Sequence, residues 1–217
     1  VMEFSVMLDL LIKGTVMTAE IFFVTLVLSL PLGLLVCFGR MSKNIIVRSF
    51  FKFYISVMRG TPLMLQLMVF YFGPYYLFHI QITDTWKQLA WILGFSLNYA
   101  AYFAEIYRGG IESMPRGQYE AAKILGYSRS QTFMRIILPQ VIKRVMPSIT
   151  NEAITLVKDT SLAFTLSIME LFNQAKALAA RETNMIPYAI AALIYYVFCL
   201  LVAFVMERVE KKMSYYR

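Results

Sequence analysis

The chain has 217 residues, of which 59% are hydrophobic and 16% are charged, and its formal net charge is +8. Soluble domains average roughly 45–50% apolar and about 25% charged residues, so this composition indicates a membrane protein. The single histidine, His79, argues against a metal site built from several imidazoles, and Cys37 and Cys199 lie inside apolar runs that give no sign of a disulfide framework.

Five segments are long enough to cross a bilayer. A hydrocarbon core of about 30 Å needs a helix of roughly 20 mostly apolar residues. The N-terminal region carries acidic residues and lacks a basic segment, so we expect the first apolar run to be a permanent span and not a cleaved signal. The sequence predicts an all-α membrane protein, one transmembrane domain over 1–217, with spans at 15–39, 54–80, 86–107, 145–169 and 187–206.

The distribution of basic residues predicts the orientation of these spans. Cytoplasmic loops are enriched in lysine and arginine. The segment after the first span, the segment 108–144 and the C-terminal tail are basic, whereas 81–86 and 170–186 are nearly neutral. We therefore expect the N-terminus outside and the C-terminus inside. This topology accounts for the positive charge, which disfavours nucleic-acid binding as its explanation.

The predicted cytoplasmic loop 108–144 has the pattern of two short amphipathic helices. Residues 118–125 are good helix formers, and Gly126 supplies a C-cap. Ser128 and Gln131 form a capping-box pair that opens a second helix, which we expect to stop before Pro139. Such a basic module either lies on the lipid surface or docks to a soluble partner.

The segment 145–169 is long enough to span but carries charged side chains. Glu152 and Asp159 are seven residues apart, so they fall on nearly one helix face, separated by roughly 10 Å of rise. Charge inside a bilayer is costly, so such residues face a cavity or a partner. Two stacked carboxylates suit an amino acid with a basic side chain, and we expect Asp159 to hold its α-amino group and Glu152 its side-chain cation. The alternative is a structural role beside a basic group, for which Lys158 is one candidate.

Other polar residues inside the spans either line the same cavity or hydrogen-bond neighbouring helices. They are Thr15, Thr18, Gln66, Ser96 and Asn98. Glu105 is expected to pair with Arg108 three residues later. The sequence does not assign a role to Arg59, for which an ion pair that shapes a gate is one interpretation.

The cytoplasmic loop also carries a known signature. EAAKILG at 120–126, followed by IILP at 136–139, resembles the EAA motif of ABC importer membrane subunits, at that motif's spacing. Four further segments resemble the polar amino-acid permease branch of that family, in order. They are RGTPLMLQL at 59–67, AAYFAEIYRGGI at 100–111, MPRGQ at 114–118 and LVKDTSL at 156–162. The resemblance covers the chain from about residue 14 to its C-terminus.

The resemblance implies a type I ABC importer permease fold in the bacterial cytoplasmic (inner) membrane. It implies two cytoplasmic ATP-binding subunits that carry ATP and Mg²⁺, a second permease subunit (identical or related), and an extracytoplasmic amino-acid-binding protein. The residues that would couple to the ATPase are Arg116, Glu120, Ala121, Ala122 and Gly126. The candidate substrate-binding residues are Thr15, Gln66, Asn98, Glu152 and Asp159.

We therefore expect a transport subunit, not an enzyme, that imports a polar, basic amino acid by alternating access. The sequence contains no G-x-x-x-x-G-K-[ST] phosphate loop, so ATP hydrolysis is expected on a separate chain. The alternative is an ion- or proton-coupled secondary transporter that uses Glu152 and Asp159. Such transporters usually show internal repeats, and the sequence shows none. An intramembrane enzyme is disfavoured because no span carries a nucleophile–base pair or a metal-ligand cluster.

Overall fold

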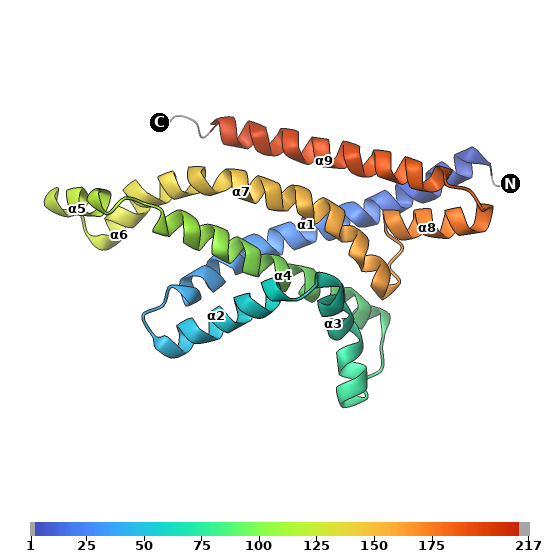
Figure 1. The fold of residues 1–217 in the computed structure, drawn as a ribbon, viewed down its shortest axis with the longest axis horizontal. Helices are drawn as coiled ribbons and strands as arrows, with labels where there is room; N and C mark the ends of the chain where they lie inside the picture. The colour runs from blue at the N-terminus through green and yellow to red at the C-terminus, as the bar shows by residue number, and fades with distance from the viewer. Residues whose placement is uncertain (1–2, 213–217) are drawn as a thin grey trace.

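The computed structural model describes residues 3–212, and every regular element in this part of the chain is helical (Figure 1). The elements are α1 (Phe4–Arg40), α2 (Ile45–Gly60), α3 (Leu63–Phe78), α4 (Asp84–Glu112), α5 (Arg116–Ile124), α6 (Arg129–Thr132), a π-helical turn (Phe133–Ile137), α7 (Leu138–Asp159), a 3-10 segment (Thr160–Leu166), α8 (Leu171–Glu182) and α9 (Ile186–Lys212). The predicted all-α fold class is confirmed.

The core forms where α4 packs against α1 and α7. Trp91, Phe95, Tyr99 and Phe103 recur every four residues on α4, and each is at most 2% exposed. Such spacing places them on one stripe of the helix, which faces the neighbouring helices. A Cβ atom on Gly33 of α1 would lie 2.8 Å from the Cβ atom of Phe103, so only glycine allows α1 to approach α4 this closely.

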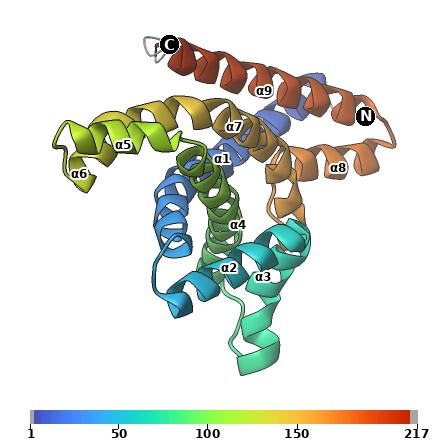
Figure 2. The same ribbon diagram turned by 60° about the vertical axis from the view of Figure 1, so that its left-hand side comes forward.

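The predicted second span, 54–80, is broken into two helices. The axes of α2 and α3 differ by 109°, and the bend lies between Gly60 and Leu63 (Figure 2). Pro62 cannot donate a backbone hydrogen bond and its ring disfavours a helical conformation at the preceding residue. Thr61 is accordingly extended, with φ −123° and ψ 148°. The proline ends one helix and starts the next.

The helices differ in how well they suit a lipid environment. Within the described residues, α1 and α9 are long and apolar enough to cross a membrane, and the bent α2–α3 pair makes a third if it is one broken span. The predicted spans at 86–107 and 145–169 correspond to α4 and to α7 with its 3-10 extension, which are not among these candidate spans. The count of five spans and their orientation stay predictions.

The predicted cytoplasmic module lies at the end of the molecule opposite the N-terminus (Figure 1). Gly126 has φ +79°, the left-handed conformation that a helix C-terminus uses, and Ser128 and Gln131 form a complete capping box. Both of these local predictions are confirmed.

The expectation that the second helix stops before Pro139 is wrong. The chain continues from α6 through the π-helical turn into α7, and Pro139 occupies the first turn of α7. A proline ring clashes with the preceding helical turn in a regular α-helix. The wider π-turn accommodates the ring, and the first turn of the new helix does not need the missing N–H group. The second helix of the module and α7 are therefore continuous.

The segment 170–186, expected to be a connection, contains α8. This helix packs against both α1 and α9 near the N-terminus (Figure 1). A Cβ atom on Gly14 would lie 2.9 Å from the Cα atom of Leu171, so glycine again permits the contact. Glu170 caps α8: its carboxylate accepts hydrogen bonds of 2.7 Å from the backbone N–H groups of Phe172 and Asn173.

Candidate functional site

Asp159, the last residue of α7, is held by an aromatic residue of α4. The Tyr99 hydroxyl donates a hydrogen bond of 2.8 Å to Oδ2 of Asp159. Tyr99 is only 2% exposed, whereas Asp159 is half-buried. The carboxylate is therefore positioned by one buried partner and keeps part of its surface accessible, as a ligand-binding group requires.

Glu152 lies two turns earlier on α7 and is also half-buried. Within residues 3–212, neither it nor Asp159 forms an ion pair with a lysine or arginine. The helix thus presents two carboxylates on one face, as the sequence predicts, and each lacks a direct cationic partner.

Arg59 and two tyrosines extend this polar region onto α2 and α4. The Arg59 guanidinium lies 5.2 Å from the centre of the Tyr102 ring, and the rings of Tyr102 and Tyr99 are 6.1 Å apart. Nη1 of Arg59 is 3.9 Å from Oε2 of Glu105. A chain of contacts therefore runs from the end of α2, along α4, to Asp159. The sequence does not predict a role for these two tyrosines at the site, because their pattern is the same as that of aromatic residues in a helix core.

Gln66 and Asn98 are engaged with each other at the break between α2 and α3. The Asn98 side chain donates hydrogen bonds of 2.9 Å to Oε1 of Gln66 and 3.0 Å to the backbone oxygen of Met58. The Gln66 amide nitrogen donates to the same oxygen of Met58 and to both oxygens of Thr61. These bonds satisfy the backbone carbonyls of Met58 and Thr61 near the break. The side-chain amides of Gln66 and Asn98 therefore already have hydrogen-bond partners within the protein.

Thr15 is not brought together with the carboxylates. Its hydroxyl donates a hydrogen bond of 2.8 Å to the backbone oxygen of Leu11, one turn earlier in α1. Its side chain borders a groove of about 360 Å³ between α1 and α9, whose other lining residues are apolar: Ala19, Leu193, Ile194, Val197, Phe198 and Leu201. Thr18, in contrast, is fully buried and accepts a hydrogen bond from the backbone N–H of Leu171.

Glu170 is a buried charged group that sequence reasoning missed. Its side chain is 0% exposed and, besides capping α8, accepts a hydrogen bond of 2.9 Å from the Tyr195 hydroxyl of α9. Glutamate is not a favoured N-cap residue, so its position before the helix gave little signal. Its three partners assign it to holding α8 and α9 together.

The predicted cytoplasmic module, which consists of α5, α6 and the turn between them and is called the EAA module below, exposes the residues that the family resemblance assigns to coupling. Arg116, Glu120, Ala121 and Gly126 are exposed, and Ala122 is buried at 1%. Ile124 and Leu125 at the tip are 86% and 73% exposed, an unusual position for large apolar side chains. A hollow of about 650 Å³ lies between the two helices, and partial burial there raises the pKa of the Tyr119 phenol. The exposed apolar tip favours a protein partner.

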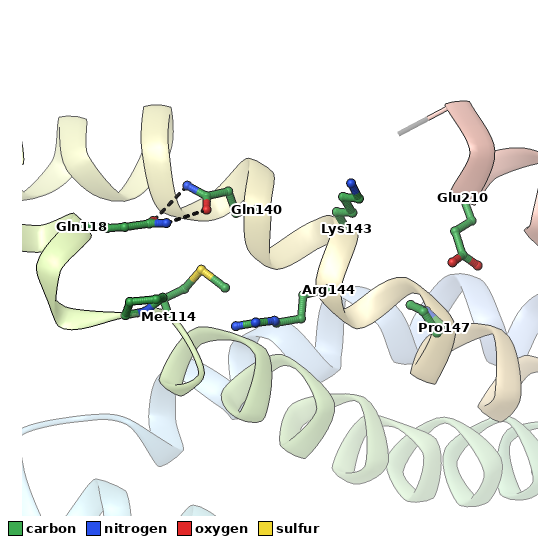
Figure 3. A pocket seen from close by; sticks show the side chains of 8 residues that line it. Met114, Gln118, Gln140, Lys143, Arg144, Pro147 and Glu210 are labelled. Carbon is green, nitrogen blue, oxygen red and sulfur yellow. Dashed lines mark hydrogen bonds between the residues drawn. The ribbon is translucent and has the colours of Figure 1, made fainter. Parts of the chain in front are cut away.

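A second pocket, of about 480 Å³, shows how this module is attached to α7 (Figure 3). The side-chain amides of Gln118 and Gln140 exchange two hydrogen bonds of 2.8 and 2.9 Å, which join α5 to α7. Nη1 of Arg144 donates to the backbone and hydroxyl oxygens of Ser113 at the end of α4. The helix that carries Glu152 and Asp159 is therefore bonded directly to the EAA module.

Comparison with known proteins agrees with this geometry. Residues 29–215 match the family model described as the inner membrane component of binding-protein-dependent transport systems. The chain belongs to this family. It is 41% identical to the probable amino-acid ABC transporter permease protein YckA of Bacillus subtilis, covering 94% of this chain and 89% of that protein.

Other relatives in the family carry different substrate names. The chain is 37% identical to the arginine transport system permease protein ArtQ of Bacillus subtilis, covering 94% of this chain and 92% of that protein. It is 35% identical to a putative glutamine transport system permease protein GlnP of Rickettsia typhi, with the same two coverages of 94% and 92%.

A solved structure described as an amino acid ABC transporter with histidines superposes with a TM-score of 0.86 and 30% identity, covering 98% of this chain and 99% of that chain. The family and its relatives are transport subunits and not enzymes, and their ATPase is a separate subunit. The chain is therefore an amino-acid ABC permease of the type I importer fold. The secondary-transporter alternative is not favoured.

Proposed function

We propose that this permease moves a polar, basic amino acid into the cytoplasm and that ATP hydrolysis on partner subunits drives the transport. The observation that carries the choice of substrate is the pair of half-buried carboxylates, Glu152 and Asp159, on one face of α7 without a direct cationic partner. One carboxylate binds the α-amino group and the other binds the side-chain cation. Uncompensated charge of this kind in a span marks a functional site.

The complete importer contains this chain, a second identical or related permease subunit, two cytoplasmic ATP-binding subunits with ATP and Mg²⁺, and an extracytoplasmic binding protein. A single permease cannot enclose a path alone. When the ATP-binding subunits close, they displace the docked EAA module. The Gln118–Gln140 amide pair and the continuous helix through Pro139 then transmit this displacement to α7. Movement of α7 exposes its two carboxylates alternately to the outside and to the cytoplasm.

We also propose five spans in the bacterial inner membrane, at 15–39, 54–80, 86–107, 145–169 and 187–206 within a single domain over 1–217. The N-terminus lies outside, and the loop 108–144 is cytoplasmic. The basic loops and the position of the EAA module opposite the N-terminus support this orientation (Figure 1). Membrane-impermeant thiol labelling from outside is expected to reach cysteines introduced at 83 and 180 and to miss those at 44 and 129; the reverse pattern contradicts the topology.

The substrate proposal is tested with the reconstituted permease–ATPase complex in the absence of the binding protein, so that only the permease's own preference is measured. The variants are Glu152→Gln and Asp159→Asn. In at least one of them, we expect the stimulation of ATP hydrolysis by arginine and lysine to weaken far more than the stimulation by glutamine. Losing one partner of a buried charge pair costs about 3–5 kcal/mol. The exposed Glu207→Gln serves as the matched control.

If both variants keep the wild-type preference between cationic and neutral amino acids, the basic-substrate proposal is wrong. Transport in vesicles tests the energy source. Uptake is expected to require ATP on the cytoplasmic side and to persist when an ionophore collapses the ion gradients. Loss of uptake with the ionophore would favour the secondary transporter instead.

A further inference from the structure

Arg59 is a cation of the polar region that lacks a full set of acceptors. It lies in the last turn of α2, directly before the break at Pro62, and its side chain is 44% exposed. Its nearest carboxylate oxygen is Oε2 of Glu105, at 3.9 Å. That separation exceeds a hydrogen-bond distance. Within residues 3–212 no hydrogen bond from Arg59 is formed, although a guanidinium carries five N–H donors.

Glu105 does not need Arg59, because Arg108 already satisfies it. Nε of Arg108 donates to both Glu105 oxygens at 3.1 Å, and Nη2 donates to Oε2 at 2.6 Å. Arg108 also binds Glu112. The predicted Glu105–Arg108 pair is thus confirmed, and both carboxylate oxygens of Glu105 accept hydrogen bonds from Arg108. Arg59 is a second, loosely associated cation beside a carboxylate that is already neutralised.

Tyr102 holds the guanidinium without using its donors. The Arg59 Cζ atom lies 5.2 Å from the ring centre, which is within the range of a cation–π contact. This contact occupies none of the guanidinium N–H groups with an oxygen acceptor, so they are available to a planar acceptor. Arginine suits this arrangement because its fork matches a carboxylate at two points, whereas a lysine offers a single point charge.

Tyr102, which contacts Arg59, follows Tyr99, the partner of Asp159, on α4 in the direction of the EAA module. Glu152 lies in the same direction from Asp159 on α7. The free guanidinium therefore lies on the Glu152 side of the carboxylate pair. On α7 this is the side that leads toward the EAA module, since Glu152 precedes Asp159 along the helix.

An amino acid is a zwitterion, and two carboxylates alone account only for its positive groups. Glu152 and Asp159 would repel the α-carboxylate of the substrate unless a nearby cation bound that carboxylate. We propose that Arg59 is the specificity-determining residue that binds the α-carboxylate of the transported amino acid through its free N–H groups. This inference rests on the proposed function, because it places the ligand at the same site.

The position of Arg59 also orients the ligand. The α-amino group is attached to the same carbon atom as the α-carboxylate, so it lies at Glu152. The side chain extends along α7 toward Asp159 and Tyr99, where a cationic end group meets the second carboxylate. This orientation reverses the roles expected from the sequence, in which Asp159 held the α-amino group.

The test compares each amino acid with the amine that remains when its carboxyl group is removed. Agmatine is arginine without the α-carboxylate, and 4-aminobutanamide is the corresponding derivative of glutamine. In the wild-type permease–ATPase complex without the binding protein, arginine is expected to stimulate ATP hydrolysis at concentrations at least about tenfold below those of agmatine. Equal potency of arginine and agmatine in the wild type overturns the proposal without any mutation.

Arg59→Gln is expected to remove this discrimination, so that arginine loses potency and agmatine changes little. Arg59→Lys is expected to retain part of it, because the charge remains but the two-point fork is lost. The matched control is Arg48→Gln, an exposed arginine near the start of the same helix. If Arg59→Gln weakens arginine and agmatine equally, the residue is structural and the proposal fails.

Two pairs of compounds, arginine with agmatine and glutamine with 4-aminobutanamide, separate this inference from the proposed function. Discrimination against the decarboxylated compound tests Arg59 for glutamine as well as for arginine. If wild type prefers glutamine to arginine yet Arg59→Gln abolishes discrimination against 4-aminobutanamide, the basic-substrate proposal fails and the Arg59 proposal stands. If wild type prefers arginine to glutamine and Arg59→Gln still discriminates against the decarboxylated compounds, the basic-substrate proposal stands and the Arg59 proposal fails.

Discussion

The Tyr99 hydroxyl donates a hydrogen bond of 2.8 Å to Asp159, and this bond joins α4 to the C-terminal end of α7. The two residues are 60 positions apart in the sequence. The bond fixes the carboxylate at the point where the regular helix gives way to the 3-10 segment. The geometry of the candidate binding site therefore depends on a tertiary contact as well as on the period of α7.

Tyr99→Phe tests how far that contact positions the carboxylate. A hydrogen bond to a charged group contributes about 1.5–3 kcal/mol. Since the buried ring can stay in place, we expect normal insertion and assembly but a loss of apparent substrate affinity of about tenfold to hundredfold. Substrate-stimulated ATP hydrolysis by the reconstituted complex measures this. A variant with unchanged affinity would show that Asp159 does not need Tyr99 for its role.

Asn98→Ala distinguishes a structural role from substrate binding at the α2–α3 break. The variant leaves Oε1 of Gln66 without its donor in a nearly buried position, where Gln66 is 8% exposed. An unsatisfied buried polar atom costs about 1–3 kcal/mol. We expect a lower thermal unfolding temperature of the detergent-solubilised complex and an equal effect on all amino acids. A selective loss of one substrate with normal stability would instead assign Asn98 to the binding site.

The local features of this fold are readable from the sequence because short-range chemistry determines them. Gly126 and the Ser128–Gln131 capping box fix the EAA module within a few residues, and the structure reproduces both. The shared face of Glu152 and Asp159 follows from the helical period. Pro139 departs from the prediction because a π-helical turn precedes it, and no residue type between 133 and 137 signals such a turn.

Features that depend on distant side chains could not be predicted. Pro62 indicates a break, but the amide pair of Gln66 and Asn98, which are 32 positions apart, stabilises it. Glu170 lies in a segment that hydropathy assigns to a connection, and its burial depends on Tyr195 of another helix. Thr15 is a candidate only because it is a polar residue in a span, and its hydroxyl donates a hydrogen bond within its own helix.

Glu170 is expected to contribute to stability and not to substrate choice. Glu170→Ala removes a carboxylate that accepts from two backbone N–H groups and from Tyr195, in a position that is 0% exposed. Tyr195→Phe removes only one of these bonds. We therefore expect Glu170→Ala to lower the thermal unfolding temperature of the solubilised complex more than Tyr195→Phe does. The matched control is the exposed Glu3→Ala; equal stability of the control and Glu170→Ala would contradict this role.

Gly126 provides the sharpest test of the coupling module, because steric contact and backbone conformation can be separated there. A Cβ atom at this position would meet no other atom within 4 Å, but its φ of +79° is strained for any residue with a side chain. The left-handed region costs roughly 1–2 kcal/mol for an ordinary residue and is least unfavourable for asparagine. Gly126→Val should therefore distort the turn between α5 and α6, whereas Gly126→Asn should preserve it.

We expect Gly126→Val to insert into the membrane but to lose co-purification with the ATP-binding subunits or to lose substrate-stimulated ATP hydrolysis and transport. Gly126→Asn should behave like wild type, and Gly117→Ala, at an open position in the first turn of α5, is the control for a simple change of size. Glu120→Lys reverses an exposed charge on the same helix and should also uncouple. Because Glu120→Lys changes charge without straining the backbone, normal co-purification and transport in both Gly126→Val and Glu120→Lys would show that the EAA module does not dock the ATPase.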